Sequence, residues 1–136
     1  AWMQLPTLRR KAPPKSIDAA SMRRGDQFFW WLELNSLLDT VAVDPFLWEQ
    51  TENRRPGKIA ANVGDGNQIR ISQGPSDNFK VGLEPSMGLR MDEPITVRYR
   101  SRSVNLNFDG SLDFLLEDVR TRADRVRPFW AQVTIP

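Results

Sequence analysis

The chain has 136 residues, with 19 basic and 17 acidic side chains but no histidine and no cysteine. The absence of cysteine excludes disulfides, thiolate nucleophiles and zinc–thiolate sites, and the absence of histidine excludes imidazole bases and the usual zinc, copper and haem ligands. We therefore expect a non-enzymatic protein with no cofactor and no catalytic or metal-binding residues. No apolar run approaches the roughly 18 residues of a membrane span, so we expect no membrane partner.

The net charge of +2 is unevenly distributed along the chain. Residues 1–24 contain six basic side chains and one acidic side chain, Asp18, while the remainder contains 13 basic and 16 acidic ones. This change of composition near Gly25 predicts a basic, proline-containing extended arm over 1–24 and a single body over 25–136. Pro13 and Pro14 exclude a continuous helix or a central strand, and one turn of helix over 16–22 is the expected local exception.

The first element of the body is aromatic. Residues 26–34 contain four consecutive aromatic side chains, which favours a buried strand, with a helix over 28–42 as the alternative. The segment 36–43 continues as a second strand or a short helical piece. Asp44 and Pro45 then predict the start of a short helix or a turn over 46–51.

The clearest hairpin signal lies in the middle of the chain. Segments 58–63 and 68–72 flank a Gly-Asp-Gly-Asn turn at 64–67, which is typical of a β-hairpin rather than a phosphate loop or a calcium loop. Residues 79–83 predict a short strand.

The alternation of apolar and polar residues is clean over 95–102 and is repeated over 104–108, as one long strand or two strands with a bend near Arg102. Three arginines, Arg98, Arg100 and Arg102, then share a face, which we interpret as a solvated face rather than as an anion-binding stripe.

The best helix signal covers 111–127, where Ser111 is the expected N-cap, acidic residues lie early and basic residues late. Residues 129–135 predict a terminal strand. The expected fold is α+β, with a mostly antiparallel sheet of about six short strands, one long C-terminal helix and an extended N-terminal arm.

Two features indicate partner binding. The arm combines apolar anchors with positive charge, and a strand through 28–31 would direct aromatic side chains to both faces of a sheet, which a subunit interface would cover. The expected partner-binding residues are Trp2, Leu5, Arg9, Arg10, Lys11, Arg23, Arg24, Phe29 and Trp31.

These features favour a non-enzymatic structural subunit of a larger assembly, which binds copies of itself and other assembly proteins through its arm. By architectural analogy we expect a virion component, such as a bacteriophage capsid, decoration, connector or tail protein. The alternative is a nucleic-acid-binding module whose basic arm contacts phosphates. A third hypothesis is a hydrolase that uses paired carboxylates, which would need two acids facing each other across a cleft.

Overall fold

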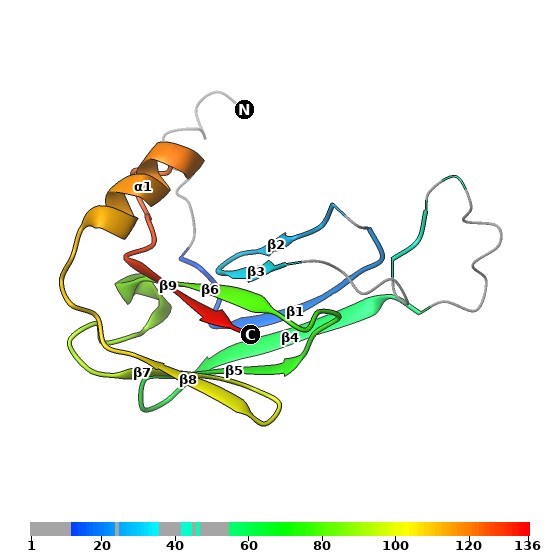
Figure 1. The fold of residues 1–136 in the computed structure, drawn as a ribbon, viewed down its shortest axis with the longest axis horizontal. Helices are drawn as coiled ribbons and strands as arrows, with labels where there is room; N and C mark the ends of the chain where they lie inside the picture. Colours follow the sequence, from blue (N-terminus) through cyan, green and yellow to red (C-terminus); the bar gives the residue numbers. More distant parts are fainter. Residues whose placement is uncertain (1–11, 24, 36–41, 45, 47–54) are drawn as a thin grey trace, which may run out of the picture.

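The computed structural model describes residues 12–23, 25–35, 42–44, 46 and 55–136. The described chain forms two β-sheets and one helix (Figure 1). In chain order the elements are β1 Ser16–Ser21, β2 Phe28–Phe29, β3 Leu32–Leu34, β4 Gly57–Gly64, β5 Gln68–Gln73, β6 Phe79–Leu83, β7 Ile95–Tyr99, β8 Arg102–Leu106, α1 Asp113–Arg122 and β9 Ala131–Ile135.

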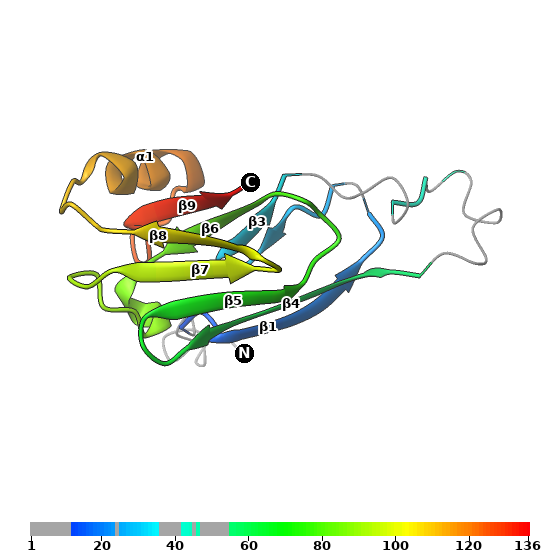
Figure 2. The same cartoon turned by 60° about the horizontal axis from the view of Figure 1, so that its bottom comes forward.

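The larger sheet has the order β1-β4-β5-β7-β8, and the smaller sheet has the order β2-β3-β6-β9. All neighbouring strands are antiparallel except β5 and β7, which are parallel. The two sheets face each other, and α1 lies beside β9 at one end (Figure 2). The mostly antiparallel architecture confirms the expected fold class in its coarse form, but the described strands form two sheets instead of the expected single sheet of about six strands.

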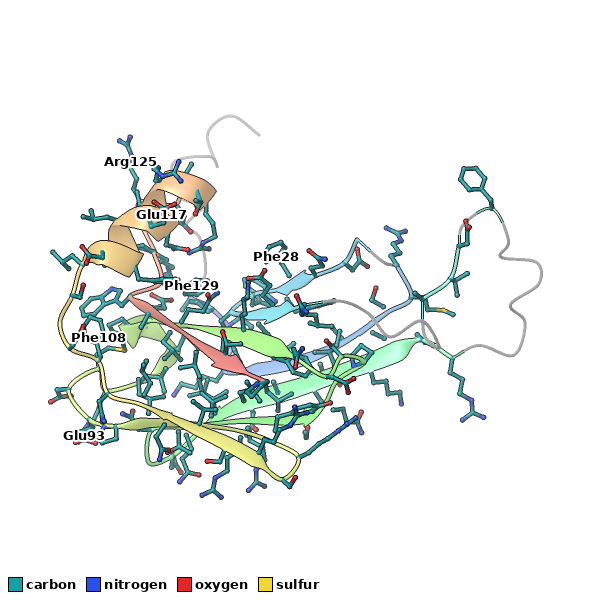
Figure 3. All side chains as sticks on the ribbon, in the orientation of Figure 1. Phe28, Glu93, Phe108, Glu117, Arg125 and Phe129 are labelled. Atoms are coloured by element: carbon teal, nitrogen blue, oxygen red, sulfur yellow. The ribbon has the colours of Figure 1, made fainter. Side chains whose placement is uncertain are left out.

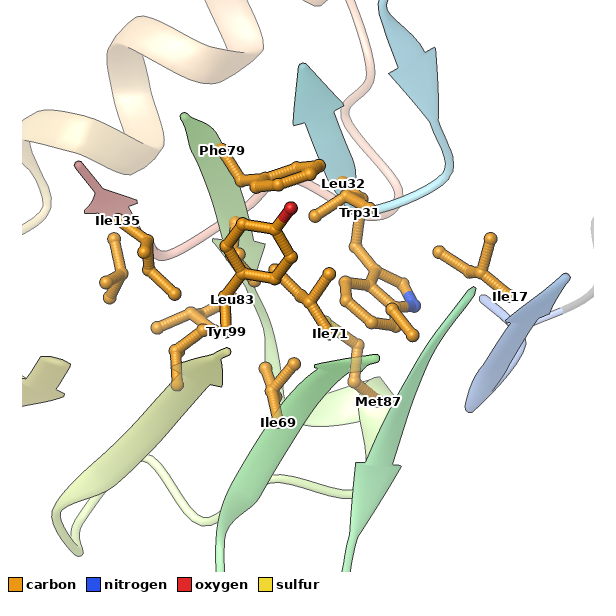
Figure 4. Packing of buried hydrophobic residues seen from close by; sticks show 14 of the residues in the cluster. Ile17, Trp31, Leu32, Ile69, Ile71, Phe79, Leu83, Met87, Tyr99 and Ile135 are labelled. Atoms are coloured by element: carbon orange, nitrogen blue, oxygen red, sulfur yellow. The ribbon is translucent and has the colours of Figure 1, made fainter. Parts of the chain in front are cut away.

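The core lies between the two sheets and follows the period-2 pattern of the strands (Figure 4). Alternate residues of β7 and β9 are buried, as is every residue of β6 except Lys80. Each large apolar side chain there contributes about 1.5–3 kcal/mol by leaving water. The rings of Phe79 and Tyr99 meet edge-on across the core with their centroids 4.7 Å apart. The Tyr99 hydroxyl donates to the carbonyl oxygens of Gly74 and Ser76, so its polar end is satisfied within the core.

The expected hairpin over 58–72 is confirmed as β4 and β5. Its turn residue Asn67 has a φ of 59°, a conformation that asparagine tolerates better than most residues. The Asn67 side chain also binds the backbone of the connection before β7, since its Oδ1 accepts from the Arg90 N–H and its Nδ2 donates to the Arg90 carbonyl oxygen.

The helix is shorter than predicted and is followed by the terminal strand β9, so it is not the last element. It ends at Ala123, which has a φ of 55° and donates its N–H to the carbonyl oxygen of Val119. The Asp124 carboxylate then accepts hydrogen bonds from the N–H groups of Val126 and Arg127. These local bonds favour a non-helical turn, so the helix does not continue. At the start, Leu112 rather than Ser111 occupies the N-cap position, although the Ser111 hydroxyl accepts the Asp113 N–H.

The N-terminal region also differs from the prediction. Residues 16–21 form β1, which pairs along its whole length with β4, instead of a helical turn. Ile17 of this strand is 4% exposed and belongs to the core. The described part of the expected arm is therefore an integral edge strand of the body, while residues 1–11 lie outside the described residues.

Candidate functional site: the aromatic hairpin

The segment expected to be one aromatic strand is instead a tight hairpin. Phe29 pairs with Leu32, so Trp30 and Trp31 form a two-residue turn between β2 and β3. Trp30 has a φ of 58°, where glycine is the usual residue of such a turn. A bulky side chain in this conformation costs of order 1–3 kcal/mol, and residues strained in this way cluster at functional sites.

The turn separates the four aromatic side chains. Phe28 and Trp30 are 67% and 62% exposed, whereas Trp31 is 1% exposed and Phe29 is half-buried. The Trp31 indole Nε1 donates to the Pro14 carbonyl oxygen over 2.9 Å, which satisfies its only polar group inside the protein. The structure therefore reverses the expected roles: Trp31 belongs to the core of this chain, and Phe28 and Trp30 are the aromatic side chains presented outward.

Trp30 lies where three surface hollows meet. One hollow of about 90 Å³ lies between Trp30 and the charged side chains of Glu84 and Arg122. A second, of about 190 Å³, lies over the outer face of the smaller sheet, where Phe28 and Trp30 approach Glu33, Lys80 and Gln132. The third is a groove that runs between β1 and β2. The exposed aromatic side chains therefore stand above concave, partly polar surface rather than on a flat face.

An ion pair between Asp118 and Arg122 stabilises the surface beside the hairpin, at the second hollow. The Asp118 carboxylate is buried on α1, accepts Arg122 Nε over 2.7 Å and also accepts the Phe129 N–H over 2.8 Å. The hydrogen bond between Arg122 and Asp118 is the main cause of the raised pKa of the Arg122 guanidinium. The same guanidinium lies 4.1 Å from the centre of the Phe129 ring. Phe129 covers Gly82 of β6, so the cluster joins α1 to the smaller sheet next to Phe28 (Figure 3).

The expected arginine face on 95–102 is not formed, because the chain turns between β7 and β8. Arg98 stays on the exposed face of β7, Arg100 lies in the turn and Arg102 begins β8. Arg100 and Arg102 instead stack near Tyr99, at 5.0 and 5.4 Å from its ring centre. The register brings Arg98 directly beside Arg70 of β5, an alignment that sequence reasoning missed because it depends on strand pairing.

Of the remaining predicted binding residues, the structure describes Arg23 alone. Arg23 is exposed on the connection after β1. Residues Trp2, Leu5, Arg9, Arg10, Lys11 and Arg24 lie outside the described residues. Phe28 and Trp30 were not singled out, although the same alternation assigned them to one face. Only the position of the turn shows which face is outward.

The described residues lack two kinds of feature. They contain no cluster of carboxylates that could hold a metal ion, and no helix long and apolar enough to cross a membrane. The Glu117 carboxylate accepts two hydrogen bonds from Arg120, and this contact lowers the pKa of Glu117.

Comparison with protein-family models, with curated proteins and with solved structures finds no match.

Proposed function

We propose that this protein is a non-catalytic structural subunit that binds other copies of itself through the aromatic hairpin. One observation carries the proposal: Trp30 has a φ of 58° and is nevertheless 62% exposed. A residue under strain that also leaves a large apolar side chain in water adds little to folding, whereas tryptophan is enriched at the centres of protein interfaces.

The surroundings of Trp30 support a protein partner. Phe28 stands beside it on the same hairpin, and the pair provides rigid aromatic area that loses little side-chain entropy on binding. Polar side chains of Glu33, Lys80 and Gln132 border the aromatic pair, as in an interface with an apolar centre and a polar rim.

The test is the native molar mass by light scattering, in low and high salt, with absorbance read at 260 and 280 nm. We expect a salt-resistant oligomer without nucleic acid, which the double variant Phe28→Ser/Trp30→Ser converts to monomers. Leu112→Ser is the matched control, because Leu112 is 59% exposed and lies at the start of α1. An oligomer that survives in the double variant would contradict the proposal.

Nucleic-acid binding is the second candidate, and the pair Arg70 and Arg98 favours it. These like charges are direct neighbours on the exposed face of the larger sheet, and neither forms an ion pair with a described residue. Such a pair is destabilising unless an anion lies over it. Under this hypothesis the protein carries nucleic acid only at low salt.

The kind of assembly remains a prediction from the sequence, which favours a virion component. Co-purification of the protein with intact particles tests it, since a virion subunit stays with the particle through a density gradient.

A further inference from the structure

The groove between β1 and β2 has the features of a strand-acceptor site. We propose that it receives residues 1–11 of a second copy of this chain, added as an extended strand. This inference rests on the proposed function, since it specifies one contact by which copies assemble.

The groove is apolar at its base and bounded by two free strand edges. It measures about 570 Å³, and its lining includes Ile17 of β1, Phe29 of β2 and the exposed Trp30. β1 ends the larger sheet and β2 ends the smaller one, so among the described strands each has a neighbour on one side only. A free edge is a template for an added strand.

The hydrogen-bond register shows which backbone groups of β1 are available. The Val63 N–H donates to the Lys15 carbonyl oxygen over 2.7 Å, so Ile17 and Ala19 also direct their backbone groups toward β4. The N–H and C=O groups of Ser16, Asp18 and Ala20 therefore point outward from the sheet.

The same reasoning applies to β2. The Leu34 N–H donates to the Gln27 carbonyl oxygen over 2.8 Å, so the backbone groups of Phe28 point away from β3. Both edges of the groove thus offer donors and acceptors to an extended segment.

Charge favours the segment 1–11 over a second β1 strand as the strand that is added to the edge of β1. The exposed side chains of β1 are those of Ser16, Asp18 and Ala20, so two β1 strands paired about Asp18 would set carboxylates directly opposite each other. The segment 1–11 instead contains three consecutive basic residues at 9–11 to oppose Asp18, and apolar residues, Trp2 and Leu5 among them, for the groove.

The way each chain enters its own β1 favours a segment from another copy. Pro14 is held by the Trp31 indole, and Lys15 already belongs to the ladder with β4. A tight two-residue hairpin along the same edge would need its turn within 12–14, where Pro13 and Pro14 disfavour it because proline cannot adopt a positive φ.

The test uses disulfide trapping, because the chain contains no cysteine of its own. Full-length Thr7→Cys protein is mixed under mild oxidation with a tagged, full-length Ala20→Cys protein. The control mixture replaces Ala20→Cys with Ser103→Cys, at an exposed position on β8 at the opposite edge of the sheet. We expect the mixed disulfide with Ala20→Cys to exceed the control at least fivefold, and Asp18→Lys to reduce it to the control level.

Three results would overturn the inference. Equal trapping at both edges would show that the segment has no preferred site, and predominant Ala20→Cys homodimers would show that β1 pairs with itself. A Thr7→Cys/Ala20→Cys double variant that forms only an intramolecular disulfide would place the segment on its own chain. Each of these can occur while the Phe28→Ser/Trp30→Ser variant still loses its oligomer, so the acceptor site can fail without the proposed function failing.

Discussion

The indole Nε1 of Trp31 donates a hydrogen bond to the carbonyl oxygen of Pro14, over 2.9 Å. This bond joins the aromatic hairpin of the smaller sheet to the segment that enters β1 of the larger sheet. It holds Trp31, which is 1% exposed, in the turn directly after the exposed Trp30. The site and the N-terminal strand are therefore one structural unit.

Removal of the Trp31–Pro14 hydrogen bond should destabilise both the aromatic hairpin and the segment that enters β1. In Trp31→Phe the Pro14 carbonyl loses its donor and the smaller ring leaves a cavity, so we expect the free energy of unfolding to fall by about 2–4 kcal/mol. Denaturant titration followed by far-UV circular dichroism measures it. An unchanged midpoint would show that the bond does not hold the hairpin.

Gly82 is required by the ring that covers it. A Cβ at this position would lie 2.6 Å from ring atoms of Phe129, which is itself held by Arg122 and the Asp118 carboxylate. We expect Gly82→Ala to reduce the free energy of unfolding by about 1–3 kcal/mol, since overpacking of a fixed ring displaces it. Gly64→Ala is the matched control, because its Cβ would meet only a backbone oxygen at 3.9 Å. Equal effects of the two substitutions would contradict this account.

Because of its single tyrosine, Tyr99, we expect the free energy of unfolding of this protein to depend on pH above neutrality. Burial raises the pKa of Tyr99 above its ordinary value of 10.0, and the guanidinium groups of Arg100 and Arg102 oppose this rise. As the pH rises past 10, the unfolded chain loses the phenol proton first, so the free energy of unfolding falls between pH 10 and the folded-state pKa. Below pH 10 the group contributes no slope.

Absorbance at 295 nm reports this titration without interference from another tyrosine. We expect a folded-state midpoint above that of the denatured chain, and a stability difference between the wild type and Tyr99→Phe that shrinks above pH 10. Coincident midpoints would mean that the phenol is not shielded from water.

Arg70 and Arg98 provide a test of the nucleic-acid hypothesis. Because they are like charges in register on an exposed face, Arg98→Gln should raise the free energy of unfolding by about 0.2–1 kcal/mol at low salt. If the face binds phosphates, the same substitution should also reduce the salt dependence of single-stranded DNA binding, by about one unit of slope. Arg125→Gln, at an exposed position after α1, is the control. If Arg98→Gln raises the stability without changing DNA binding, the two arginines only repel each other, and the nucleic-acid hypothesis loses its support.

Local patterns predicted much of the fold. Strands were predicted correctly on both sides of the Asp65-Gly66-Asn67 turn and within 79–83 and 129–135. Turn formation and alternating burial both depend on residues that are close together in the sequence. The failures share a cause. Residues 16–21 contain few large apolar side chains and become a strand because β4 offers them an edge, a long-range effect that local propensity does not contain.

The candidate site was predicted in composition but not in orientation. Alternation separated Phe28 and Trp30 from Phe29 and Trp31, yet a reversal at Trp30, where glycine is usual, has no local signal. The partnership of Arg70 and Arg98 likewise depends on a parallel pairing between strands that are more than 20 residues apart. Both features follow from tertiary structure.

The central claim is that the strain at Trp30 is kept for binding, and Trp30→Gly tests it most directly. Glycine adopts the turn conformation freely, so we expect the free energy of unfolding to rise by about 0.5–1 kcal/mol while the oligomer seen by light scattering dissociates. A variant that is less stable than the wild type, or one that retains the native molar mass of the oligomer, would contradict this account.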